Sequence, residues 1–264
     1  MTLITGRTRI FGIIADPIHH VKTPEVFNAF LQKHGVDGVL VPMHVAPEGL
    51  GDMLNGLRSM QNFGGFIVTV PHKPSVVGLC DELTADAAHI GAVNCVRRDP
   101  DGRLVGAILD GIGFVEGLRS AGIDPAGMRA YVAGAGGAAS AVAFALAGAG
   151  VASLTVGNRT EAKARDLCDR IAAAYPGLAL STDAGDVARQ DLVMNATSLG
   201  MQEGDALPLD TGQLHAGQIV AEAIMQPPMT ALLRAAQAAG CRIHPGLPML
   251  ESQIRLMAEH MKVL

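Results

Sequence analysis

One stretch, from Arg129 to Ser140, has the residue types and the spacing needed to hold a phosphate group. It fits the pattern G-x-G-x-x-A, formed here by Gly134, Gly136, Gly137, Ala138 and Ala139. The first glycine allows a tight turn, the second lets the backbone approach a pyrophosphate, and the small last residue lets a helix pack closely on a strand. A helix that begins at such a turn directs free N–H groups and positive partial charge at the phosphate.

The segments on either side of this turn have the patterns that a dinucleotide-binding unit requires. The apolar residues 130–133 predict a buried strand, and the alanine-rich residues 138–146 predict a helix. Strand, glycine turn and helix in this order indicate a dinucleotide site. The competing interpretation is an ordinary glycine-rich turn, which the motif alone does not exclude.

The strand predicted next, residues 152–157, is followed by a short polar stretch that favours one cofactor over another. A cofactor with only ribose hydroxyls at this place usually meets an acidic residue, whereas a 2′-phosphate requires a cation. The side chains that can contact such a phosphate are Asn158, Arg159, Thr160 and Lys163. The alternative is that the stretch only caps the helix predicted for residues 161–175, and Thr160 can serve both roles. The sequence therefore favours NADP over NAD.

Composition excludes several classes of protein. The chain has 264 residues, 49% apolar and 17% charged, enough apolar material for one large domain or two small ones. It has no tryptophan, only two tyrosines and a net charge of −5, which argues against a nucleic-acid surface. It shows no signal peptide, no apolar run of membrane length and no C-x-x-C pair. We therefore expect a cytoplasmic protein, a monomer or homodimer with reduced cysteines and no metal, that acts on a small molecule.

The motifs must be positioned by a framework of strands and helices, and the hydrophobic pattern predicts one. Strands are expected at residues 9–15, 39–45, 65–70, 92–97, 104–108, 191–195, 218–224 and 242–244. Helices are expected at residues 23–34, 48–60, 110–121, 230–239 and 249–262. The first helix should have Thr23 as its N-cap and Pro24 as its first residue. This alternation predicts the α/β class.

Short motifs along the chain resemble those of the shikimate dehydrogenase family, in the family's order. They are Pro17-Ile-His-His-Val-Lys-Thr-Pro24, Val68-Thr-Val-Pro-His-Lys73, Gly91-Ala-Val-Asn94, Asp110-Gly-Ile-Gly-Phe114, the glycine turn, Asn158-Arg-Thr160, Asn195-Ala-Thr-Ser-Leu-Gly-Met201 and Gly246-Leu-Pro-Met-Leu-Glu-Ser-Gln253. No single motif is decisive, but together they span nearly the whole chain. Members of this family are NADP-dependent enzymes that reduce 3-dehydroshikimate.

The resemblance implies a two-domain fold. An N-terminal α/β substrate domain, residues 1–110, should be followed by a Rossmann NADP-binding domain, residues 111–246. The closing helix, within residues 247–264, should return to the substrate domain. The active site is then expected in the cleft between the two domains.

The resemblance also implies a catalytic pair, Lys73 and Asp110. Hydride transfer at a carbinol carbon requires a proton to move at its oxygen. An ammonium group can supply that proton while a carboxylate beside it keeps it in place. Considered alone, Lys73 suits an exposed loop and Asp110 suits a helix cap, but the match of both to family motifs favours catalysis.

Further residues match the family's binding positions. Those expected to contact the substrate are Val21, Thr23, Thr69, Asn94 and Gln253. Those expected near the nicotinamide are Thr197, Gly246 and Met249. Simpler interpretations exist for several of them: a turn amide for Asn94, a surface residue for Gln253, and core packing for Met249.

Apolar residues stand at positions where the family has polar ones: Val21 for a serine, Ile67 for an asparagine, Ile108 and Leu109 for Asn-Thr, and Met225 for a tyrosine. Thr23 keeps a second hydroxyl, and Lys22 offers a compensating cation. Each lost charge-assisted hydrogen bond is worth roughly 1.5–3 kcal/mol. The sequence therefore predicts either poor handling of shikimate or another cyclic alcohol, quinate-like or less polar. A protein that binds NADP without turnover is a third hypothesis, against which the presence of Lys73 and Asp110 speaks.

Overall fold

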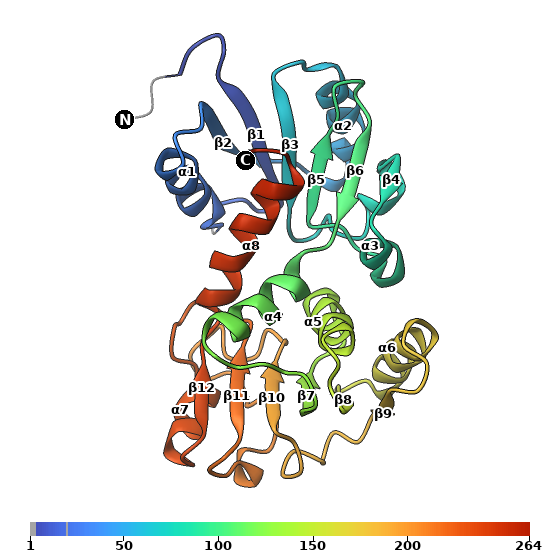
Figure 1. The fold of residues 1–264 in the computed structure, drawn as a ribbon, viewed down its shortest axis with the longest axis vertical. Helices are drawn as coiled ribbons and strands as arrows, with labels where there is room; N and C mark the ends of the chain where they lie inside the picture. The colour runs from blue at the N-terminus through green and yellow to red at the C-terminus, as the bar shows by residue number, and fades with distance from the viewer. Residues whose placement is uncertain (1–3, 20) are drawn as a thin grey trace. The chain divides into compact units, whose positions relative to one another are not determined.

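The chain forms two compact units (Figure 1). The computed structural model describes residues 4–19 and 21–264, so His20 of the first motif lies outside the described residues. Unit 1 contains the chain up to Leu109 together with Ile254–Leu264, and unit 2 contains Asp110–Gln253. Compared with the boundaries expected from the sequence, Asp110 and residues 247–253 fall in unit 2. The reason is that Asp110 begins a helix of unit 2 on which residues 248–253 pack.

Unit 1 is built on a mixed sheet with the strand order β2-β1-β3-β5-β6-β4. β1 lies between β2 and β3 and is parallel to both, whereas β5 is antiparallel to β3 and β6. All residues of β3 are buried, as expected for a strand covered on both faces. The strands are β1 (Arg9–Ala15), β2 (Gly38–His44), β3 (Phe63–Val68), β4 (Glu82–Leu83), β5 (Cys95–Arg98) and β6 (Leu104–Ala107).

Helices cover the sheet of unit 1. They are α1 (Thr23–Lys33), α2 (Leu50–Ser59), α3 (Ala85–Ile90) and the second half of α8 (Leu247–His260). α1 buries Phe27 against Phe11 of β1, with ring centroids 6.1 Å apart. The predicted cap of α1 is wrong by one position: Lys22 is the N-cap, and no side chain caps the helix. The Lys22 backbone is already helical and accepts hydrogen bonds from Glu25 and Val26, so Thr23 lies inside the first turn.

Unit 2 is built on a parallel sheet with the strand order β12-β11-β10-β7-β8-β9. From the middle of the sheet, β7, β8 and β9 follow one another in one direction, and β10, β11 and β12 follow in the other. This reversal creates a switch point between β7 and β10. Ligands of open α/β sheets bind at the carboxyl ends of the strands at such a point. The strands are β7 (Arg129–Ala133), β8 (Ser153–Gly157), β9 (Ala179–Ser181), β10 (Leu192–Asn195), β11 (Ile219–Glu222) and β12 (Arg242–His244).

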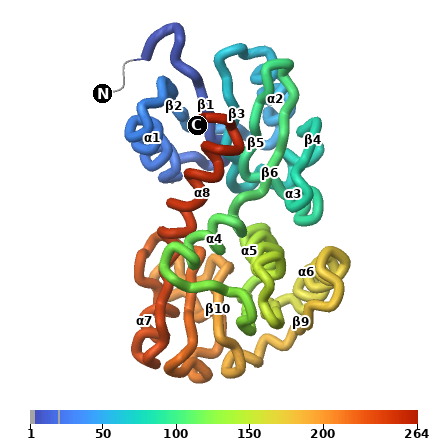
Figure 2. The backbone as a smooth tube through the Cα atoms, in the orientation of Figure 1, coloured from blue at the N-terminus to red at the C-terminus, as the bar shows by residue number. Residues whose placement is uncertain are grey.

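The helices of unit 2 are α4 (Asp110–Ser120), α5 (Gly137–Gly148), α6 (Glu161–Ala174), α7 (Ala231–Ala238) and the start of α8. Figure 2 shows the chain of this unit passing from α4 in green to the start of α8 in red. One core cluster contains Tyr131, Val193, Val220 and Leu233, which come from β7, β10, β11 and α7. The α/β class and the Rossmann arrangement of unit 2 are thus confirmed.

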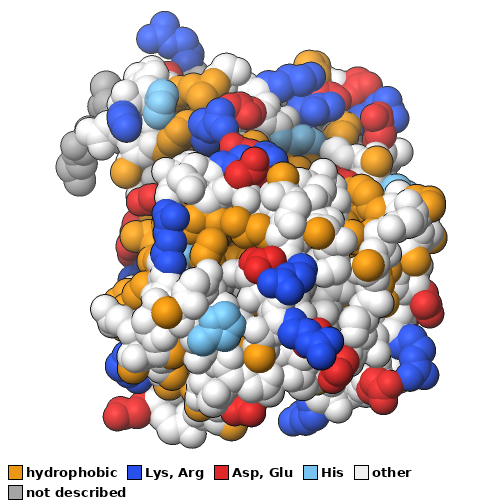
Figure 3. Space-filling model, turned by 60° about the horizontal axis from the view of Figure 1, so that its bottom comes forward, with side chains coloured by type: hydrophobic (Ala, Val, Ile, Leu, Met, Phe, Trp, Pro, Cys, Tyr) orange, Lys and Arg blue, Asp and Glu red, His pale blue; other side chains and the backbone are white. Residues whose placement is uncertain are grey.

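The surface and the helices of the described residues bear on the expected partners. On the face shown in Figure 3, Lys and Arg side chains are interspersed with Asp and Glu side chains. No helix within the described ranges combines the length and the apolar character needed to cross a membrane. In the same ranges, no three His, Cys, Asp or Glu side chains come together as a metal-binding group. All four cysteines are free.

Candidate active site

The glycine turn lies at the carboxyl end of β7 and has the predicted shape. Gly134 has φ +114°, and its N–H donates to the Gly157 carbonyl at 2.7 Å. A Cβ at Gly134 would lie 3.1 Å from the Ala196 carbonyl oxygen, so only glycine suits this position. A Cβ at Gly136 would meet no protein atom within 4 Å. Glycine is therefore not required by the fold at Gly136, and the space above the turn is available to a pyrophosphate.

The residues after the turn start α5. Gly136 is its N-cap, Gly137 and Ala138 form its first turn, and Ala139 is fully buried. The first N–H groups of a helix have no acceptor within the helix, so those of α5 can bind phosphate oxygens. α5 itself is apolar on all sides and largely buried, which holds its N-terminus firmly in place.

The polar stretch after β8 lies at the same edge of the sheet. The Asn158 amide donates to the Thr160 carbonyl at 2.9 Å, which folds the stretch into a turn. Arg159, Thr160 and Lys163 are exposed. Thr160 is the N-cap of α6, as predicted, but its hydroxyl makes no capping hydrogen bond. The Thr160 hydroxyl is therefore not engaged in capping α6, and this hydroxyl can bind a ligand.

The loop after β10, which contains Thr197, is held by a buried polar network. The Asn195 amide donates to the Leu199 carbonyl at 3.0 Å and to both carboxylate oxygens of Glu222 at 3.1 and 3.2 Å. The Asn195 oxygen accepts from the Thr197 N–H at 3.0 Å and from its hydroxyl at 2.7 Å. Burial raises the pKa of Glu222, while the Thr230 hydroxyl, which donates at 2.7 Å, acts in the opposite direction.

Glu222 is not among the residues predicted from the sequence. It is the last residue of an apolar strand, where an acidic residue is unusual, and this was the available signal. Its partner Asn195 is 27 residues away and becomes its neighbour only through the pairing of β10 with β11.

Gly246 and Met249 occupy close-packed positions. A Cβ at Gly246 would overlap the Ile224 carbonyl, so this glycine allows two segments to touch. The Met249 side chain is buried, and its backbone nitrogen would lie 3.1 Å from a Cβ at Gly117. For these two residues the structure provides a packing role within unit 2.

Asp110 and Gln253 meet inside unit 2. The Gln253 amide donates to Asp110 Oδ1 at 3.2 Å, and both residues are only 7% exposed. A Cβ at Gly113, one turn along α4, would overlap the Gln253 side chain. The glycine spacing of Asp110-Gly-Ile-Gly-Phe114 therefore brings the glutamine to the carboxylate. Gln253 is not the surface residue of the simpler interpretation.

The candidate residues of unit 1 surround the end of β3. The Asn94 carbonyl accepts from Val68 at 2.8 Å, and the Asn94 side-chain oxygen accepts from the Leu109 N–H at 2.8 Å. Asn94 is 1% exposed, yet its Nδ2 donor has no partner in the described part of the chain. A buried unpaired donor is costly unless something else binds it. An asparagine that only stabilised a turn would not need a buried, unpaired donor, so the burial of Asn94 favours a binding role.

Lys73 follows β3 on an anchored turn. The neighbouring His72 is buried, and its Nε2 lies 2.8 Å from the Val45 carbonyl oxygen. The Lys73 carbonyl accepts from the Val93 N–H at 2.9 Å, which ties the lysine backbone to the Asn94 segment. Thr69 is half-buried, and its N–H donates to Ile14 at 3.0 Å. Lys73, Thr69 and Asn94 thus belong to one small region of unit 1.

The remaining substrate candidates also differ in burial. Val21 and Thr23 are half-buried at the start of α1. Ile67, Ile108 and Leu109 are buried, whereas Met225 in unit 2 is 40% exposed.

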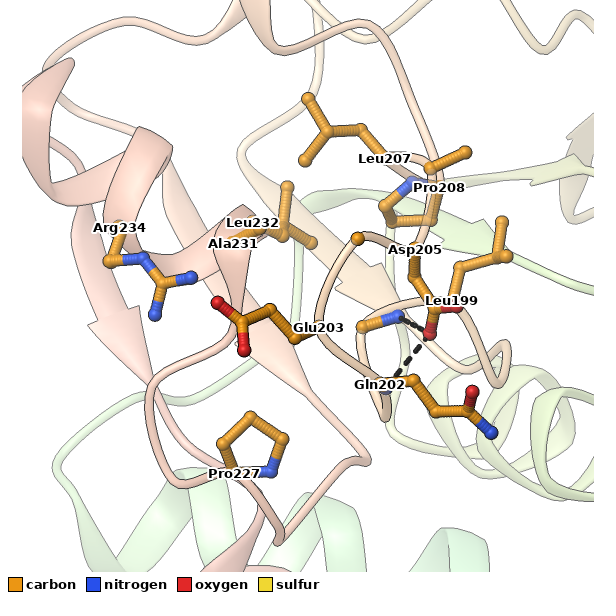
Figure 4. Close-up of a pocket in the computed structure, with 13 residues that line it drawn as sticks. Leu199, Gln202, Glu203, Asp205, Leu207, Pro208, Pro227, Ala231, Leu232 and Arg234 are labelled. Carbon is orange, nitrogen blue, oxygen red and sulfur yellow. Dashed lines mark hydrogen bonds between the residues drawn. The ribbon is translucent and has the colours of Figure 1, made fainter.

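A separate pocket of about 270 Å³ lies in unit 2 between the loop after β10 and the start of α7 (Figure 4). Asp205 holds the loop by accepting from the N–H groups of Gly200 and Gln202 at 2.9 and 3.0 Å. Glu203 and Arg234 approach one another across the opening in Figure 4. The lining contains none of the residues predicted for the active site.

Comparison with known proteins identifies the family. Residues 13–96 match the family model of the shikimate dehydrogenase substrate-binding domain, and residues 119–201 match that of shikimate/quinate 5-dehydrogenase. A shikimate dehydrogenase (NADP⁺) from Rubrobacter xylanophilus is 42% identical over 254 residues, which cover 94% of this chain and 88% of the relative.

Solved structures agree with this match. A shikimate dehydrogenase crystallised with NADP⁺ has a TM-score of 0.92 and 31% identity, covering 100% of this chain and 93% of that one. A 5-ketofructose reductase from Gluconobacter sp. strain CHM43 has a TM-score of 0.89 and 33% identity, covering 97% of this chain and 93% of that one. The chain belongs to the shikimate dehydrogenase family.

Proposed function

We propose that this protein is an NADP-dependent oxidoreductase that interconverts shikimate and 3-dehydroshikimate, or a closely related cyclic alcohol and ketone. The name of its relative at 42% identity, a shikimate dehydrogenase (NADP⁺), supports this activity. The observation in the structure that carries the proposal is the glycine turn at the switch point of unit 2, with open space above Gly136 and exposed Arg159 on the next loop.

The residues of unit 2 fit the cofactor. The N–H groups at the start of α5 suit the pyrophosphate, and Arg159 with Asn158, Thr160 and Lys163 suits the 2′-phosphate. We assign Thr197, Gly246 and Met249 to the nicotinamide side on the family resemblance. When bound, the nicotinamide supplies or accepts the hydride.

Lys73 and Asp110 are the proposed proton-transfer pair. The Lys73 ammonium gives a proton to the substrate oxygen in the reduction and takes it back in the oxidation. The Asp110 carboxylate orients that ammonium, and Gln253 in turn fixes the carboxylate through its 3.2 Å hydrogen bond. The unpaired Nδ2 of Asn94 is a donor for a substrate hydroxyl, beside Thr69. Val21 and Thr23 complete the proposed substrate contacts.

A second candidate is the same chemistry on a different substrate. Ile67, Ile108 and Leu109 are buried apolar side chains where the family's polar contacts are expected, so hydroxyl recognition by these residues is lost. One structure similar to this chain is a 5-ketofructose reductase, which indicates that this fold accepts substrates other than shikimate. A cytoplasmic location and a monomeric or homodimeric state complete the proposal. Light scattering, which measures the mass of the particle in solution, tests the monomeric or homodimeric state.

The direct experiment follows NADPH absorbance with NADP⁺ and shikimate, then with quinate, other cyclic alcohols and open-chain polyols. Turnover of shikimate supports the first candidate, and turnover of another alcohol alone supports the second. Binding of NADPH without turnover of any alcohol would contradict the proposed activity.

Removal of the proton donor tests the mechanism. General acid–base groups contribute about 10²- to 10⁴-fold, so Lys73→Ala should lower kcat by that factor and leave NADPH binding unchanged. Asp110→Asn should have a similar effect, and the two losses should not add because the groups act together. Lys33→Ala, at the exposed end of α1, is the control and should keep full activity. A normal kcat for Lys73→Ala would exclude this mechanism.

A further inference from the structure

Glu222 is a carboxylic acid with no exposed surface at the end of an inner strand of unit 2. A buried carboxylate is costly unless it is well paired, so its position needs a reason. Its hydrogen-bond partners are both donors: the Asn195 amide and the Thr230 hydroxyl. The two donors come from two different segments, the end of β10 and the N-cap of α7, so the carboxylate connects these segments at one point.

The first of these segments carries Thr197. Glu222 and Asn195 are register partners on β11 and β10, which places their side chains next to each other. The carboxylate holds the Asn195 amide nitrogen, and this fixes the Asn195 oxygen on the side of Thr197. That oxygen accepts both hydrogen bonds from Thr197, at 3.0 and 2.7 Å. The orientation of the amide, and with it the position of Thr197, therefore depends on Glu222.

The Thr197 segment then packs on the glycine turn. A Cβ at Gly134 would lie 3.1 Å from the Ala196 carbonyl oxygen and 3.2 Å from Thr197 Cγ2. Ile224, two residues after Glu222 along the chain, packs on Gly246. The segment that Glu222 holds through Asn195, and the chain just after Glu222, thus contact residues proposed for cofactor binding.

We propose that Glu222 is a positioning residue for the cofactor: it holds the loop after β10 against the glycine turn in the geometry that binds NADP. This inference rests on the proposed function. It requires a carboxylate in particular, because the Asn195 amide donates to both of its oxygens and the Thr230 hydroxyl donates to one of them. A glutamine of the same size would direct its own NH₂ group at one of these donors.

The test is Glu222→Gln, measured by NADPH fluorescence titration. The dissociation constant for NADPH should rise about tenfold, equivalent to about 1.4 kcal/mol. The KM for NADP⁺ should rise by a similar factor, with a smaller change in kcat. In the double variant Asn195→Asp with Glu222→Gln, the new glutamine amide can donate to the new aspartate carboxylate. Most of the lost NADPH affinity should therefore return.

Gln218→Ala is the matched control for a purely structural role. Gln218 is equally buried and directly precedes β11 at its other end, where its amide donates to Val187 and Gln190 at 2.9 and 2.8 Å. This variant should melt at a lower temperature and bind NADPH with wild-type affinity.

Three results would overturn the inference. Glu222→Gln could bind NADPH as tightly as the wild type, or Gln218→Ala could weaken binding as much as Glu222→Gln does. Both would show that Glu222 does not position the cofactor, while the proposed function stands. Wild-type protein that does not bind NADPH would instead contradict the proposed function, and the inference with it.

Discussion

Gly136→Ala should separate cofactor binding from folding. Gly136 has ordinary extended backbone angles, φ −87° and ψ −172°, which alanine adopts without strain. The added methyl group would meet no protein atom within 4 Å. It would instead occupy the space that we assign to the pyrophosphate.

Gly136→Ala should change the stability of the fold much less than it changes NADPH binding. Alanine is a poorer N-cap than glycine by roughly 0.5 kcal/mol, while the stiffer unfolded chain contributes about 0.4–1 kcal/mol in the opposite direction. The net change in stability should therefore stay within about 0.5 kcal/mol, or about 2 °C in Tm. Displacing the pyrophosphate from even one N–H group removes a charge-assisted hydrogen bond worth roughly 1.5–3 kcal/mol. The dissociation constant for NADPH should then rise roughly 10- to 150-fold.

Thermal unfolding and NADPH fluorescence titration measure the two quantities on the same samples. Gly134→Ala is the contrasting variant: φ +114° imposes strain of order 1–3 kcal/mol, so its Tm should fall by several degrees. Gly56→Ala, exposed in α2 of unit 1 with open space around it, should leave binding unchanged. Unchanged NADPH affinity in Gly136→Ala would show that the pyrophosphate does not approach this backbone, and the reasoning would be refuted.

Three further predictions concern the cofactor, pH and substrate. Arg159→Ala should raise the KM for NADP⁺ strongly and that for NAD⁺ little; equal effects would mean that Arg159 does not contact the 2′-phosphate. Burial, together with the charge of Arg242, lowers the pKa of His244 below its usual 6.5, so the stability linked to neutral His244 is present above about pH 6.5 and is lost as pH falls through the lowered value. Thermal melts between pH 7.5 and 5 should show this fall, and a His244→Leu variant should show a shallower one. Restoring polar groups with Ile67→Asn and Met225→Tyr should lower the KM for shikimate more than it changes kcat, because such contacts lie away from the reacting carbon; weaker binding of shikimate by both variants would contradict our account of the substrate site.

The sequence predicted the elements whose pattern is strong. β1 and β12 have the predicted bounds, and α5 and α6 lie within two residues of theirs, because apolar runs and alanine-rich stretches favour one structure clearly. Helix α3 was missed, since its six residues, Ala-Asp-Ala-Ala-His-Ile, carry no apolar stripe. The available signal was Thr84, whose hydroxyl caps the helix by accepting from Ala87 at 3.3 Å.

The site residues divide in the same way. The glycine turn could be predicted because its requirements are local: a backbone with positive φ at Gly134 and a small residue at Ala139. Glu222 could not, because its partners are brought together only by the pairing of two strands. The proposed role of Gln253 in substrate binding rests on the family resemblance alone. Its position beside Asp110, in the space left by Gly113, is visible only in the packed helices.

The glycines of α4 also bear on how this enzyme could be redesigned by directed evolution. Side chains at Gly111, Gly113 or Gly117 would press on the Ala141 carbonyl of α5 or on the first turns of α8. Such pressure would displace α4 and, with it, Asp110 at its first position. A library aimed at new substrates should therefore keep these three codons fixed. It should vary the positions where the chain already departs from the family's polar residues, namely Val21, Ile67 and Met225.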